Sequence, residues 1–165
     1  MAYVGRFATT RAKLRSYLDR KIRERGWEGS SEADVEGICE RFAQQGYVDD
    51  AAYALSKSRS LSGRGYGPGR VEQSLRAAGI SEADGEAARE LVHGEAVEAA
   101  LRFAARRRLG PYADGIPDPK TRERALSAMV RAGHRFSLAR AVLDLPPGAQ
   151  ADAEELAELL GINTS

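Results

Sequence analysis

The chain has 165 residues, of which 42% are hydrophobic and 30% are charged, enough apolar material for one globular domain and too much charge for a membrane span. The first six residues contain no apolar signal core, and the single Cys39 cannot form an internal disulfide, so we expect a cytoplasmic protein with no membrane association. Its 25 basic and 24 acidic residues give a net charge of +1, which by itself favours no particular partner.

Charge alternates along the chain in six blocks. The net charge is +5 over residues 1–30, −5 over 31–56, +4 over 57–78, −5 over 79–100, +7 over 101–143 and −5 over 144–165. Such blocks arise by chance on charged helical surfaces, or they mark an internal repeat. We favour the repeat, because other features recur at the same period.

Three basic helices are expected to end at Gly26, Gly79 and Gly133, which are 53 and 54 residues apart. Glycine after a basic last turn is a common helix stop, since it adopts the left-handed conformation that side chains resist. The residues four and eight positions before each glycine are apolar and form one helical stripe: Ile22 and Leu18, Leu75 and Val71, Met129 and Ala125.

The first basic helix is followed by two more predicted helices. The tetrapeptide Ser31-Glu32-Ala33-Asp34 opens an acidic helix that ends at Gly46, because serine caps free amides and early carboxylates oppose the helix dipole. Asp49 or Asp50 then caps a third helix that runs through Leu55. A loop over residues 58–69 is expected to follow it and is a candidate hinge.

The same order recurs in the remaining two units. Ser81-Glu82-Ala83-Asp84 repeats the opening tetrapeptide, and a further helix runs from about Glu95 to Arg108. After a loop over residues 109–117, which is a second candidate hinge, helices are expected over residues 119–132, 137–143 and 151–160.

No segment alternates apolar and polar residues between turn signals over a useful length, so the predicted fold is all-α. We expect three tandem three-helix repeats, over residues 8–61, 62–110 and 111–165, within one domain. Each repeat is too small to bury its own apolar face, so the repeats are expected to form an elongated, curved helical stack.

The sequence holds no recognisable catalytic motif. Its two histidines and one cysteine lack metal-ligand spacing, no serine lies in a nucleophile elbow, and no phosphate-binding P-loop is present. Asp49 and Asp50 are better explained as a helix cap than as a catalytic carboxylate pair. We therefore expect no enzymatic activity, no metal and no cofactor.

Residues 40–81 carry a specific resemblance. The segments Gly46-Tyr47-Val48-Asp49-Asp50, Tyr53-Ala54, Gly65 to Val71 and Gly79-Ile80, together with Leu75, resemble the RecX family of bacterial recombination regulators. The match weakens elsewhere but keeps its order, and that family's architecture is also a threefold repeat of helices. The chain departs from the family pattern at Gly133-His134-Arg135-Phe136, where two residues separate glycine from phenylalanine.

The resemblance implies a regulator, usually negative, of the RecA recombinase in homologous recombination, DNA repair and the SOS response. Such proteins lie in the groove of the RecA filament on single-stranded DNA. They inhibit strand exchange and ATP hydrolysis or promote filament disassembly. A monomer with weak affinity for single- or double-stranded DNA is consistent with this expectation.

Basic and aromatic residues are the candidate contacts to a RecA filament or to DNA. In the connector they have an alternative structural role beside the helix start at Pro68, and at the end of the helix before residue 109 cations also favour the helix dipole. The candidates are Arg64, Tyr66, Arg70, Arg102, Arg106, Arg107, Arg108, Lys120 and Arg124. The same residues also suit a stand-alone nucleic-acid-binding module acting through basic helices, or, less well, a protein-only scaffold.

Overall fold

The computed structural model describes residues 9–162, and every regular element in that range is helical. The elements are α1 (Arg11–Arg25), α2 (Val35–Gln44), α3 (Asp50–Gly63), α4 (Pro68–Ala77), α5 (Glu82–Gly94), α6 (Ala96–Arg107), η1 (Gly110–Tyr112), α7 (Pro119–Arg131), α8 (Phe136–Asp144) and α9 (Ala153–Leu160). The all-α prediction is confirmed over this range. The N-terminal six residues and the outer ends of the first and third predicted repeats lie outside the described residues.

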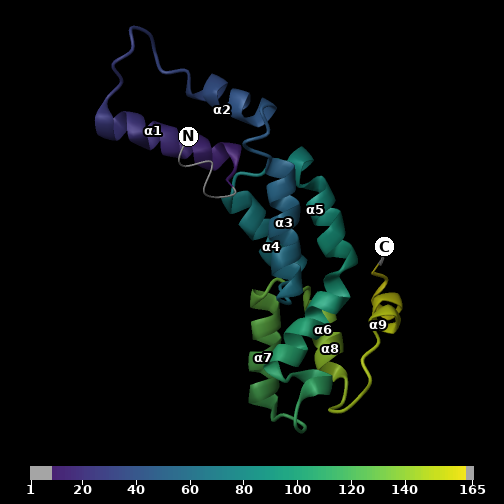
Figure 1. Ribbon diagram of the computed structural model, residues 1–165. Helices are drawn as coiled ribbons and strands as arrows, with labels where there is room; N and C mark the ends of the chain where they lie inside the picture. Colours follow the sequence, from purple (N-terminus) through teal and green to yellow (C-terminus); the bar gives the residue numbers. More distant parts are fainter. Residues whose placement is uncertain (1–8, 163–165) are drawn as a thin grey trace.

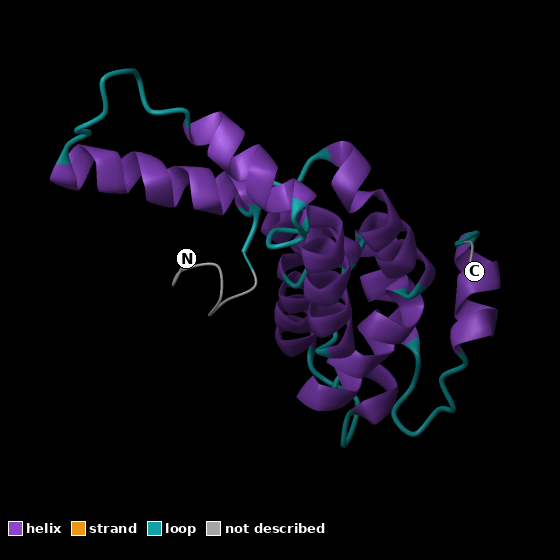
Figure 2. Cartoon of the chain, turned by 45° about the horizontal axis from the view of Figure 1, so that its top comes forward, coloured by secondary structure: helices purple, strands orange, loops and turns teal. Residues whose placement is uncertain are grey.

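The helices form an elongated stack that bends near one end. Helices α1 and α2 lie side by side as an arm that projects from the rest of the molecule (Figure 1). Helices α3 to α5 form a middle group, and α6 to α9 form a C-terminal group at the other end (Figures 1 and 2). No helix in residues 9–162 has the length and apolar character that crossing a bilayer requires.

Three apolar clusters divide the described chain in the same way. The arm has a small cluster around Leu14, Cys39 and Val48, whereas Val71 and Leu75 are among the fully buried residues of the middle group. The C-terminal group has the largest cluster. Helix α3 packs with α4 and α5, although the sequence repeat over residues 8–61 assigns it to the first unit. The repeat boundaries themselves stay a prediction.

The local helix signals are partly confirmed. Gly26, Gly79 and Gly133 follow α1, α4 and α7 with φ of 79°, 72° and 94°, as a glycine stop requires. Asp49 caps α3 through the backbone N–H of Ala52 at 2.8 Å. Asp50, the alternative cap, is instead buried and pairs with α1.

The repeated tetrapeptide acts differently in its two places. Ser81 caps α5 through the backbone N–H of Asp84, whereas α2 begins only at Val35, with Asp34 as its cap. The Ser31 carbonyl, which would accept the first helical hydrogen bond from Val35, accepts one from the Trp27 indole at 2.5 Å instead. The cap expected at Ser31 therefore lies at Asp34, three residues later.

The expected loop over residues 58–69 is wrong in its first half, because α3 continues to Gly63. Ser58, Leu61 and Ser62 are buried at helical spacing, and this packing overrides the weak helix propensity of serine and glycine. Only residues 64–67 connect α3 to α4. The expected helix over 119–132 is confirmed, with α7 spanning Pro119–Arg131.

The turn between α3 and α4 is bonded to the turn between α7 and α8. The backbone N–H of Gly67 donates to the Ala132 carbonyl at 2.9 Å, and that of Gly69 donates to the Gly133 carbonyl at 3.0 Å. A Cβ at Gly67 would lie 2.5 Å from the Gly133 carbonyl oxygen. This segment therefore joins the middle and C-terminal groups closely, where the sequence suggested a flexible hinge.

Polar contacts at the start of α1 join the arm to the middle group. The buried Thr10 hydroxyl donates to the Ala78 carbonyl at 2.7 Å. Arg11 donates from its backbone N–H to Asp50 at 2.9 Å, and its guanidinium reaches Asp50 at 3.3 Å and Asp84 at 2.8 Å. One residue of the arm thus pairs with carboxylates from both α3 and α5.

Replacing Gly67 with alanine tests the close approach of the two turns. We expect G67A to lower the free energy of unfolding by about 2 kcal/mol through the clash with the Gly133 backbone, or the melting temperature by about 5 °C. The control G63A places a methyl group where no atom lies within 4 Å and is expected to be neutral or stabilising. Equal effects of both variants in thermal denaturation would contradict the assignment.

The same junction contains a buried histidine. His134 is 3% exposed, its Nε2 lies 3.0 Å from the Gly65 carbonyl oxygen, and its Nδ1 has no hydrogen-bond partner among the described residues. Burial lowers the pKa of His134 below its ordinary value of 6.5, because a charged ring would be poorly solvated there.

Acidification should therefore destabilise the fold through His134. The unfolded chain binds a proton near pH 6.5 and the folded chain only at lower pH, so stability is full above that pH and falls as the pH drops below it. Each unit of pKa depression corresponds to about 1.4 kcal/mol. Melting curves between pH 7.5 and about 5.5 should show this decline, and H134Q should remove it, whereas the exposed-site control H93Q should retain it.

Candidate functional site

Basic side chains of α6 meet the C-terminal end of α3. Arg102 Nε donates to the Ser62 carbonyl oxygen at 3.3 Å, and Arg106 Nη1 donates to the Arg64 carbonyl oxygen at 2.8 Å. Carbonyl groups at a helix C-terminus lack partners within the helix and carry partial negative charge. Arg102 and Arg106 therefore cap α3 from a neighbouring helix, a structural role that their sequence positions do not reveal.

Arg102 also belongs to a small polar network. The Ser62 hydroxyl donates to Glu95 Oε2 at 2.6 Å and accepts from Arg102 Nη2 at 3.3 Å. Arg102 and Glu95 form an ion pair at 3.7 Å, and Ser62 itself is buried. The network connects α3 to the beginning and middle of α6. The Arg102 guanidinium therefore has its main polar contacts within the molecule.

Arg64 and Tyr66 occupy the connector between α3 and α4. The Arg64 guanidinium lies 5.6 Å from the centre of the Tyr66 ring, and its Nε donates to the Ser60 carbonyl at 3.1 Å. Tyr66 packs against the apolar clusters of both the middle and the C-terminal group. The tyrosine is thus chiefly a packing residue, whereas Arg64 stays exposed beside it.

Arg107 and Arg108 face solvent at the end of α6. The Arg107 guanidinium lies 5.5 Å from the centre of the Phe103 ring. Arg108 ends the helix in the left-handed conformation, with φ of 52°, and pairs with Asp114 at 3.6 Å. Both members of that pair are more than three-quarters exposed, so the pair adds little stability and leaves the guanidinium accessible.

Lys120 and Arg124 lie four residues apart on α7 and therefore share a helix face. Both are exposed, and within residues 9–162 neither forms an ion pair. Their neighbour Arg122 instead pairs with Asp144 of α8. Asp118 caps the same helix, and the hydroxyl and backbone N–H of Thr121 lower the pKa of its carboxyl group by donating to it.

The structure thus brings part of the candidate set together. Arg64, Tyr66, Arg102 and Arg106 meet at the junction of α3 and α6, and Arg107 follows Arg106 as the last residue of α6. Arg70 lies on α4, where it is exposed and hydrogen-bonds Gln73 at 2.8 Å. Lys120 and Arg124 form a separate exposed pair on α7.

Candidate residues on α1 are missing from this set. Lys13 and Arg20 line an open cleft between α1 and α4, to which Arg76 also contributes. The +5 charge of residues 1–30 is the sequence signal that could have indicated them. Among the described residues, no group of three or more histidine, cysteine, aspartate or glutamate side chains is placed to hold a metal ion.

Comparisons with protein-family models and with curated proteins both match the same family. The family model described as RecX, second three-helix domain, matches residues 49–88, which cover α3, α4 and the first part of α5. The match falls on helices that share the middle apolar cluster. No solved structure matches the chain significantly.

Several proteins named "Regulatory protein RecX" are similar in sequence to this chain, over aligned lengths that range from 71 to 156 residues in three of them. The one from Myxococcus xanthus (strain DK1622) is 35% identical over 156 residues, covering 88% of this chain and 82% of that protein. The one from Agrobacterium fabrum (strain C58 / ATCC 33970) is 31% identical over 138 residues, covering 81% and 73%. The one from Pseudomonas putida is 39% identical over 71 residues, covering 43% and 48%.

Truncating Arg106 tests its capping role. We expect R106A to lower the free energy of unfolding by about 1 kcal/mol, because the Arg64 carbonyl loses a charged donor. The control R124A removes the same side chain from an exposed site without an ion pair, and it should stay within about 0.5 kcal/mol of the parent. Urea denaturation measures both, and equal stabilities would show that Arg106 does not cap α3.

Proposed function

Because the chain belongs to the RecX family of regulatory proteins, we propose that it regulates the RecA recombinase without catalysing a reaction itself. The similarity over most of the chain to proteins named as regulators is the observation that carries this proposal. It acts as a cytoplasmic monomer and needs no cofactor. Its effect on RecA is negative.

The mode of action we propose is binding along the groove of the RecA filament on single-stranded DNA. An elongated stack of helices presents contacts over a long distance, and many weak contacts on one body sum to useful affinity. The bound protein inhibits strand exchange and ATP hydrolysis or promotes filament disassembly. The elongated arrangement of arm, middle group and C-terminal group supports this mode.

The exposed cations are the contact residues in this proposal. Lys120 and Arg124 have no ion pair within the described chain, and Arg107 and Arg108 are exposed at the end of α6. Arg64 and Arg70 are exposed on the connector and α4. Such residues attract an acidic protein surface or a phosphate backbone at long range.

A second candidate function is that of a stand-alone nucleic-acid-binding module. The basic helices favour it, since cations on a helix face neutralise phosphates and release counterions. The two functions differ in their need for RecA. RecA's ATP hydrolysis on single-stranded DNA, measured with this protein titrated in, should be inhibited well below the concentration that coats the same DNA without RecA. Inhibition only at coating concentrations would favour the module.

Charge reversal on α7 tests the contact residues. We expect K120E/R124E to raise the concentration needed for half-inhibition of RecA ATP hydrolysis about tenfold, since two attractive contacts become repulsive. R23E/R59E reverses two exposed charges on α1 and α3 instead and should leave inhibition nearly unchanged. Circular dichroism of both variants checks that the helices remain. Equal inhibition by K120E/R124E and the parent would remove α7 from the contact surface.

A further inference from the structure

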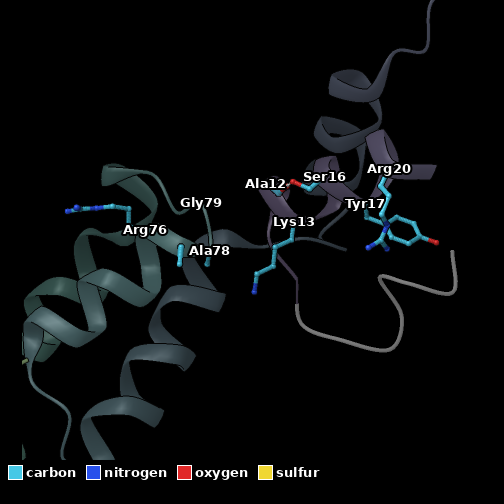
Figure 3. Close-up of a pocket in the computed structure, with 9 residues that line it drawn as sticks. Ala12, Lys13, Ser16, Tyr17, Arg20, Arg76, Ala78 and Gly79 are labelled. Carbon is cyan, nitrogen blue, oxygen red and sulfur yellow. Dashed lines mark hydrogen bonds between the residues drawn. The ribbon is translucent and has the colours of Figure 1, made fainter. Parts of the chain in front are cut away.

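An open cleft of about 360 Å³ lies between residues 12–20 of α1 and residues 76–79 at the end of α4. Figure 3 shows Lys13, Tyr17 and Arg20 on the α1 side and Arg76, Ala78 and Gly79 on the α4 side. The start of α1 approaches the turn after α4 closely because residue 79 is glycine, and a Cβ there would collide with that of Ala12. The cleft therefore lies at the joint between the arm and the middle group.

The α1 side of the cleft carries surplus positive charge. Arg20 is 3.7 Å from Glu24, but Lys21 holds the same carboxylate at 2.7 Å and is the main cause of its lowered pKa. Lys13 contributes a second cation, whose ammonium group donates to the Tyr53 hydroxyl at 2.9 Å. It forms no ion pair with any carboxylate in residues 9–162. Of the described residues that line the cleft, none is acidic.

The α4 side repeats this arrangement. Arg76 lies 3.4 Å from Glu72, while Arg89 of α5 holds that carboxylate at 2.7 Å and is the main cause of its lowered pKa. The Arg76 side chain is 80% exposed at the rim of the cleft. Among the described residues, the three cations that line the cleft thus lack a carboxylate of their own: Lys21 and Arg89 hold the partners of Arg20 and Arg76 more closely, and Lys13 forms no ion pair.

The remaining lining residues indicate which class of anionic ligand suits the cleft. Tyr17 places an aromatic ring on the wall, with the Arg20 guanidinium 5.6 Å and the Lys21 ammonium 5.9 Å from its centre. The other apolar lining side chains are alanines, so the cleft lacks the deep apolar pockets that anchor a peptide. Cations beside an aromatic ring are instead typical of sites for single-stranded nucleic acid.

We propose that the cleft between α1 and α4 binds single-stranded nucleic acid, with Lys13, Arg20 and Arg76 on its phosphates and Tyr17 against a base. The site is separate from the α3–α6 junction and from the exposed pair on α7. The proposal does not depend on regulation of RecA, since the nucleic acid binds to this chain directly. A strand in the cleft touches both the arm and the middle group.

The test is the binding of a fluorescein-labelled oligothymidylate to the full chain, followed by fluorescence anisotropy at several salt concentrations. We expect K13Q/R20Q to weaken binding about tenfold or more at low salt and to reduce the slope of log K against log salt by about 1.4, the value for two lost phosphate contacts. The matched control R23Q/R59Q removes two exposed charges outside the cleft. It should bind with nearly the parent's affinity.

Replacing Tyr17 with leucine separates stacking from general charge attraction. We expect Y17L to weaken oligothymidylate binding about fivefold or more, since a stacked base is worth about 1–3 kcal/mol, and to leave the salt slope unchanged. Binding of polyglutamate by the parent and by Y17L serves as the comparison. If K13Q/R20Q loses polyglutamate but not oligothymidylate, the occupant is an acidic protein segment and the proposal is wrong.

Equal losses of oligothymidylate affinity in K13Q/R20Q and R23Q/R59Q would also overturn the proposed cleft site. Binding would then depend on the net charge of the chain and not on the cleft. Melting curves of each variant identify any that fail to fold, and Y17L gives an independent measurement if K13Q/R20Q does. RecA ATP hydrolysis is assayed separately with the same proteins. A cleft variant that keeps full inhibition of RecA while losing oligothymidylate separates this site from the proposed regulatory contacts.

Discussion

The turn between α3 and α4 fixes the relation between the middle and C-terminal groups, because its backbone is hydrogen-bonded to another turn. Gly67 and Gly69 donate to carbonyl groups at the end of α7, and no side chain fits between the two backbones at Gly67. Tyr66 packs against the apolar clusters of both groups, and the buried His134 ring reaches the Gly65 carbonyl oxygen at 3.0 Å. Residues of low helix propensity are thus needed here for close packing, and the carbonyl groups at the end of α7 are satisfied across the junction.

The joint of the arm rests on a different kind of interaction. The arm has only a small apolar cluster of its own, and Thr10 and Arg11 connect it to the middle group through hydrogen bonds and ion pairs. Ionic contacts respond to salt and to competing charges more than buried apolar contacts do. The basic cleft proposed to bind nucleic acid lies at this joint, beside these ionic contacts.

The basic residues of the chain divide into two functional classes. Arg102 and Arg106 direct their charge to the carbonyl end of α3, and Arg11 directs its charge to buried or half-buried carboxylates. Lys120 and Arg124 remain exposed without ion pairs in the described chain. Only residues of the second class add to the field that attracts a partner, so counts of charge in a segment overstate its binding surface.

The sequence by itself determined the all-α fold, the glycine stops after α1, α4 and α7, and the resemblance of residues 40–81, because these depend on local periodicity, backbone conformation and short motifs. Only the tertiary structure decided the continuation of α3 through Ser58 and Ser62, the delayed start of α2, and the grouping of α3 with α4 and α5. It also decided which arginines cap a helix and which face solvent. These outcomes depend on contacts between residues tens of positions apart, and neither spacing nor composition encodes which distant group a long side chain reaches.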